Sequence, residues 1–80
     1  MRYEIKNFEV EGENKFVGFK ITDSQGRLFY IDKRILIVEG KTDEQYVSEA
    51  LALCEQEIQE WQDSFRLIGR VWNPNTNSFE

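Results

Sequence analysis

The sequence predicts an α+β fold in which an antiparallel sheet of three to five strands carries one long amphipathic helix on one face. Apolar and polar residues alternate through most of the N-terminal half, and apolar residues then recur at steps of four and three. Clusters of Gly, Asn, Asp and Ser separate the alternating segments, as in sheets connected by tight turns. The expected element order is β-β-β(-β)-α-β, and 80 residues suit a single domain over residues 1–80.

The first expected strand changes phase along its length. Tyr3 and Ile5 alternate with charged residues, and Phe8 and Val10 then alternate in the opposite phase. Because successive side chains of a strand point to opposite faces, one extra residue is needed to keep these four on one face. We therefore expect a β-bulge near Lys6-Asn7.

The second expected strand follows a polar turn and places Val17, Phe19 and Ile21 on one face. The next turn, Asp23-Ser24-Gln25-Gly26, has Asp at its first position and Gly at its last, as in a type I turn. These features predict a hairpin.

The third apolar segment runs from Arg27 to Val38 and contains the charged run Asp32-Lys33-Arg34. It forms either one long bent strand or two short strands, and we expect a break at the charged run. The apolar residues out of phase with the expected core are candidates for a sheet face that the helix leaves uncovered: Phe16, Phe29 or Tyr30, and Trp72.

A capping box predicts where the helix begins. Thr42 can accept a hydrogen bond from the third helical amide, and Gln45 can reach back to the Thr42 amide. The apolar stripe that follows predicts an amphipathic helix of about six turns. This stripe suits either a dimer seam or packing on the domain's own sheet, and we expect the sheet. Its members are Val47, Ala50, Leu51, Cys54, Ile58, Trp61 and Phe65.

The C-terminal segment is predicted to add a last strand. Leu67 to Trp72 has strand-like composition, and Asn73-Pro74-Asn75 is typical of a turn. The ending from Ile68 to Phe79 is similar to short Trp-Asn-Pro or Tyr-Asp-Pro endings of some bacteriophage-associated proteins. That resemblance implies a mobile-element origin and no particular mechanism.

Composition excludes several kinds of site within these residues. The sequence has no histidine, which excludes Ser-His-Asp catalysis, Cys-His catalysis and histidine metal ligands. Its single cysteine, Cys54, cannot form an internal disulfide and falls on the apolar stripe. No apolar run approaches the length of a membrane span, and no signal peptide is evident, so the expected location is the cytoplasm. We predict no catalytic residue, no metal site, no cofactor and no membrane contact.

Charge distribution is the most informative functional feature. From Thr42 to Phe65 the chain has seven acidic residues and no Lys or Arg, so the formal charge of this segment is -7. The whole chain has a formal charge of -5, so the remaining residues together carry +2. Such a helix either keeps a small protein soluble or presents an acidic face to a basic partner. The overall acidity makes nucleic acid an unfavourable partner. The acids that avoid the apolar stripe are the predicted partner-binding residues: Glu49, Glu55, Glu57, Glu60 and Asp63.

An aliphatic segment ending in Glu-Gly precedes the capped helix, in the run Ile35-Leu36-Ile37-Val38-Glu39-Gly40-Lys41-Thr42-Asp43. This run resembles the first motif of Toprim domains, found in primases, topoisomerases, small ribosomal-RNA maturases and nucleases of the overcoming-lysogenisation-defect type. The resemblance implies a parallel α/β sheet and, for Glu39, acid-base or metal chemistry on phosphodiesters. The family's later Asp-x-Asp, which holds magnesium, has no counterpart in this sequence. The same residues also fit a buried strand, a turn glycine and a helix N-cap.

The sequence therefore predicts a small non-enzymatic protein-binding domain, adaptor or inhibitor-like, that acts through an acidic helix face or an uncovered sheet face. The expected partner is a protein, basic where it meets the helix. Two alternatives stay open. One is a reduced Toprim-like, metal-dependent nucleic-acid enzyme fragment using Glu39, and the other is a homo-oligomeric structural protein such as a homodimer.

Overall fold

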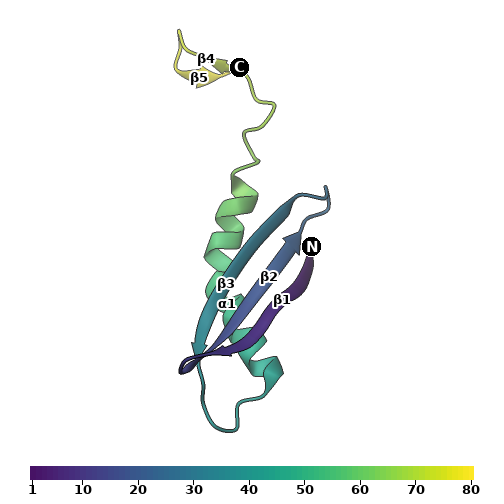
Figure 1. Cartoon of the computed structure of the whole chain (residues 1–80). Helices are drawn as coiled ribbons and strands as arrows, with labels where there is room; N and C mark the ends of the chain where they lie inside the picture. Colours follow the sequence, from purple (N-terminus) through teal and green to yellow (C-terminus); the bar gives the residue numbers. More distant parts are fainter.

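The computed structural model describes residues 1–80 and contains a three-stranded antiparallel sheet followed by one helix that packs on it (Figure 1). A separate sheet of two short strands lies near the C-terminus. The predicted α+β class and the order β-β-β-α-β are confirmed. The elements are β1 (Arg2–Glu11), β2 (Asn14–Thr22), β3 (Leu28–Leu36), α1 (Asp43–Asp63), β4 (Trp72–Asn73) and β5 (Ser78–Phe79).

The predicted bulge in β1 is present. Ile5 pairs with Phe19 and Asn7 pairs with Gly18, so Lys6 is the extra residue. A Cβ atom at Gly18 would lie 2.6 Å from Oδ1 of Asn7, so the Asn7 side chain occupies the space that a larger residue would need. The bulge therefore keeps Tyr3, Ile5, Phe8 and Val10 on one face of the sheet.

The break expected in the third segment is wrong, because β3 is continuous from Leu28 to Leu36. Alternation directs Asp32 and Arg34 to the face away from α1 and Lys33 towards α1. The Lys33 ammonium donates to Oε1 of Glu57 at 2.5 Å. A charged residue can occupy the helix-facing side of a strand when its long stem reaches an acid at the edge of the helix.

Asp23 holds the predicted turn between β2 and β3. Its Oδ1 accepts from the backbone N–H of Gln25 and of Arg27, each at 2.9 Å, and its Oδ2 accepts from Nε of Arg27 at 2.6 Å. Desolvation acts to raise the pKa of Asp23, but these hydrogen bonds together hold the pKa below its ordinary value. The turn closes with Gly26 at φ 79°, a conformation that favours glycine.

The capping box also forms as predicted. Oγ1 of Thr42 accepts from the Gln45 amide at 3.2 Å, and Oε1 of Gln45 accepts from the Thr42 amide at 2.8 Å. The stripe packs on the chain's own sheet, as expected, with Val47, Leu51 and Trp61 half-buried against the core. The buried core consists of Val17, Phe19, Ile21, Ile31, Ile35, Tyr46, Ala50, Cys54 and Ile58.

Tyr46 is the core residue that the stripe did not include. Its hydroxyl accepts from the backbone N–H of Val38 at 3.0 Å and donates to the Val38 carbonyl at 3.2 Å. The ring can therefore be buried with its polar end satisfied, and the same side chain ties the loop after β3 to α1.

The strand predicted from Leu67 to Trp72 is largely wrong. Successive turns follow α1, closed by backbone bonds from Arg66 to Asp63, from Ile68 to Phe65 and from Arg70 to Leu67. Only the last of the expected strand residues, Trp72, lies in a strand, and β4 pairs with β5 instead of joining the central sheet. Turns that bond three residues back consume the backbone groups that a strand would offer to a neighbour.

The C-terminal hairpin projects beyond the end of α1 and away from the sheet (Figure 1). The molecule measures 60 × 22 × 16 Å, and its radius of gyration is 17.5 Å. A compact chain of this length has a radius of gyration of about 12 Å. The body, residues 1–65, and the C-terminal arm, residues 66–80, are therefore distinct parts of the molecule.

Candidate functional site

The helix covers only part of the sheet. It packs mainly over β3 and less over β2, and its backbone does not come within contact distance of β1. Three strands are about 14 Å wide, whereas a helix with its side chains is about 10 Å across. The helix-facing side of β1 is left open, and Tyr3, Ile5 and Val10 are 43–63% exposed.

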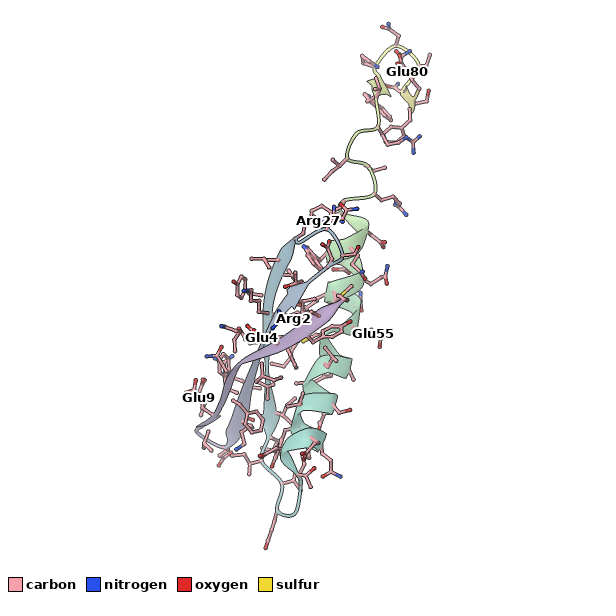
Figure 2. All side chains as sticks on the ribbon, turned by 90° about the vertical axis from the view of Figure 1, so that its right-hand side faces the viewer. Arg2, Glu4, Glu9, Arg27, Glu55 and Glu80 are labelled. Atoms are coloured by element: carbon pink, nitrogen blue, oxygen red, sulfur yellow. The ribbon has the colours of Figure 1, made fainter.

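A groove of about 400 Å³ lies between the N-terminal end of β1 and the adjacent flank of α1. Apolar side chains form half of its lining, and Glu55 is the single charged residue in it. Figure 2 shows Glu55 on the helix beside β1. The eight lining residues are Tyr3, Ser48, Leu51, Ala52, Glu55, Ile58, Gln59 and Gln62. A concave apolar surface with few polar groups is the usual form of a binding site.

Two of the predicted acids are paired with lysines of the same chain. Oε2 of Glu49 lies 2.6 Å from Nζ of Lys41, and Oε1 of Glu57 lies 2.5 Å from Nζ of Lys33. The hydrogen bond from Glu57 raises the pKa of Lys33 despite the opposing effect of desolvation. These two acids are therefore partly neutralised by bases of the same chain.

The other three predicted acids have no basic partner. Glu60 and Asp63 accept hydrogen bonds from Gln56 and Gln59, at 3.2 and 3.1 Å, on the outer side of the helix. Glu55 makes no hydrogen bond or ion pair and lines the groove. Of the five predicted residues, two are therefore paired with lysines, two accept hydrogen bonds from glutamines, and one lines the groove.

The sheet face away from α1 is charged and internally paired. Phe16 and Tyr30 lie on it, as expected, whereas Phe29 points to the helix side and Trp72 belongs to the arm. The Arg34 guanidinium lies 5.0 Å from the Phe16 ring centre and is also bonded to Oε1 of Glu11 at 2.7 Å. Pairing of Arg34 with Glu11 raises the pKa of Arg34. Charged and polar residues predominate on this face, and its apolar members on β2 and β3 are Phe16, Leu28, Tyr30 and Leu36.

An aromatic cluster joins the end of α1 to the β2–β3 turn. Phe29 stacks on Trp61 with 5.1 Å between ring centres, and Trp61 meets Phe65 edge-on at 5.7 Å. The Arg27 guanidinium lies 3.8 Å from the Phe65 ring centre. The spacing of Trp61 and Phe65 by four residues was a sequence signal for their contact, but the partners from β3 and the turn were not predictable from it. This cluster anchors the point at which the arm leaves the body (Figure 2, near Arg27).

The arm exposes large apolar side chains. Leu67, Ile68, Val71, Trp72 and Phe79 are 37–70% exposed. Within the hairpin, Trp72 and Phe79 meet edge-on at 5.1 Å, and the Arg70 guanidinium lies 4.5 Å from the Phe79 ring centre. Arg66 and Arg70 make the arm basic up to its last residue, Glu80. Sequence reasoning assigned Leu67 to Trp72 to a last strand of the sheet and therefore did not predict this surface.

Glu39 lies exposed in the loop between β3 and α1, next to Gly40 at φ 85°. The structure contains no group of three or more His, Cys, Asp or Glu side chains placed to hold a metal ion. The central sheet is antiparallel, so the parallel sheet implied by the Toprim resemblance is wrong for this chain.

Cys54 is fully buried in the core, as expected. Burial raises the pKa of its thiol, although the nearby Lys33 ammonium acts in the opposite direction. The thiol therefore stays protonated at neutral pH and packs as a small apolar group.

Comparison with protein-family models, curated proteins and solved structures finds no match to this chain. No helix of the structure combines the length and the apolar character needed to cross a membrane. The groove, the outer acids and the arm are the surfaces from which a function can be argued.

Proposed function

We propose that the protein is a non-enzymatic, adaptor or inhibitor-like domain that binds a partner protein in the groove between β1 and α1. The bound segment has apolar side chains and a basic residue that faces Glu55. The observation that carries this proposal is that one helix leaves the β1 side of its sheet face open.

Apolar contact supplies most of the binding free energy in this proposal. Tyr3 is 46% exposed on one wall, and the half-buried Leu51 lies in the other. Burying apolar surface contributes about 25 cal/mol per Å², and a tyrosine at the centre of an interface is a frequent source of affinity. A partner that covers Tyr3 also excludes water from Glu55.

The unpaired charge of Glu55 favours a partner with a basic residue at this position. Glu55 has no basic neighbour, and α1 contains no Lys or Arg, so the helix side of the groove favours a cation. Complementary charge raises the rate of association and discriminates between partners more than it raises affinity. The complex should therefore weaken as salt concentration increases.

A matched pair of tyrosine variants tests the position of the site. Immobilised protein is incubated with lysate of the source cell, and captured proteins are quantified for the wild type, for Tyr3→Ser and for Tyr30→Ser. Tyr30 is 61% exposed on the opposite sheet face. Proteins lost with Tyr3→Ser and kept with Tyr30→Ser support the groove. The reverse pattern, or no loss with either variant, overturns it.

The outer acids support a second candidate surface, since Glu60 and Asp63 lack basic partners. Glu55→Lys and Glu60→Lys change the same charge on the same helix, one inside the groove and one outside it. A loss of capture with Glu55→Lys alone supports the groove. A loss with Glu60→Lys alone moves the interface to the outer side of α1.

A further inference from the structure

The arm has apolar surface that its own chain does not cover. Ile68 and Val71 are 70% and 57% exposed. A two-stranded hairpin has no second layer against which to bury these side chains. The arm therefore has the character of a segment that completes its packing on another surface.

The groove has the complementary chemistry. It is half apolar, and its one charge is the carboxylate of Glu55. The arm combines aliphatic and aromatic residues with two cations, Arg66 and Arg70, and has no acid before Glu80. It is thus an apolar, basic segment of the kind that the groove is proposed to bind.

Length also agrees. The 15 residues of the arm reach at most about 50 Å when extended. The groove follows α1 from Ser48 to Gln62, which is about 21 Å. The arm leaves the body next to the Gln62 end of its own groove. If a second copy lies antiparallel to the first, the arm would enter the second copy's groove at the Gln62 end of that groove.

We infer that two copies of this chain associate by exchanging arms, with the arm of each copy in the groove of the other. This inference rests on the proposed function, because it names the occupant of the same groove. The exchange is a two-fold arrangement in which every arm and every groove is used. Each copy would contribute the fifteen residues of its arm and the eight residues that line its groove. Their total falls within the roughly 20–30 residues per side of a standard interface.

Solution mass measures the association. Sedimentation equilibrium from low micromolar to near-millimolar concentration should show a mass rising from 9.5 kDa towards twice that value. Ile68→Ser with Val71→Ser should abolish the rise. The matched control, Leu28→Ser with Leu36→Ser, changes two exposed residues of β3 and should keep it. A wild type that stays monomeric overturns the inference.

Disulfide trapping identifies the contact. Protein with Gln59→Cys in the groove is mixed with protein carrying Val71→Cys in the arm, and the buried Cys54 does not compete. A disulfide between these two variants supports exchange, provided that protein with Lys20→Cys, on the sheet face away from α1, does not form a disulfide with the same arm variant. If one chain carrying both new cysteines closes an internal disulfide while the mixture forms none, the arm folds onto its own groove and exchange is overturned.

The two proposals fail separately. A monomeric chain without trapped pairs overturns arm exchange, whereas the Tyr3→Ser capture experiment still decides whether the groove binds another protein. Trapped pairs with no captured protein lost on Tyr3→Ser support exchange and overturn the binding of a different partner.

Discussion

Phe19 in β2 is 2% exposed, whereas Trp72 in the arm, a larger aromatic residue, is 51% exposed. Both residues lie in strands, but β2 is the central strand beneath a helix, and β4 pairs only with β5. The difference shows that strand formation does not bury a side chain. Burial needs a second layer, which the body has and the arm lacks.

The largest expected effect comes from deleting aromatic side chains in each region. Phe19→Ala should lower the free energy of unfolding by about 3–5 kcal/mol, because it leaves a cavity in the core. Phe79→Ala in the arm should change it by less than about 0.5 kcal/mol. Urea unfolding followed by circular dichroism measures both values. Similar losses for the two variants would show that the arm folds as one unit with the body.

The next effect concerns the hydroxyl of Tyr46, which ties the loop after β3 to α1. Tyr46→Phe leaves the Val38 N–H without its partner, and we expect a loss of about 1–3 kcal/mol. Tyr30→Phe removes an exposed hydroxyl and is the control. Equal stability of the two variants would mean that water replaces the hydroxyl at Val38.

A smaller loss should follow removal of the helix cap. Thr42→Ala removes the oxygen that accepts from the Gln45 amide, at a cost of about 1 kcal/mol. Thr76→Ala in the arm removes a hydroxyl that contacts only Ser78, and the same urea titration should show no measurable change. Comparable losses of unfolding free energy for Thr42→Ala and Thr76→Ala would show that local contacts in the arm stabilise the protein as much as those in the body.

The smallest effect is a pH dependence from Asp23. Its pKa is lower in the folded protein than its ordinary value of 3.8, so its carboxylate stabilises the fold above that pH. The stabilisation is lost as the pH falls below 3.8 and through the lower folded pKa. Acid unfolding of Asp23→Asn should lack this component, and Asp63→Asn, on the outer side of α1, should retain it. An unchanged acid profile in Asp23→Asn would contradict the assignment.

Features made by neighbouring residues were predictable. The bulge at Lys6, the turn held by Asp23 and the capping box at Thr42 each depend on residue types within a few positions of one another. The continuity of β3 was not predictable from the charged run, because Lys33 is accommodated by Glu57, which lies 24 residues later. The pairing of Glu57 with Lys33 and of Glu49 with Lys41 was not predictable either, because it depends on which residues of β3 and of the loop before α1 lie beside the helix.

The sequence by itself determined the α+β class, the order of the main elements and the apolar faces, because alternation, periodicity and capping act over short distances along the chain. Only the tertiary structure decided that α1 lies over β3 and β2, that β1 stays open to form the groove, and that the arm stays apart from the sheet. These outcomes depend on the width of the sheet relative to the helix that packs on it, and on whether the C-terminal segment reaches an edge strand of the sheet. A pattern read along the chain contains no such information.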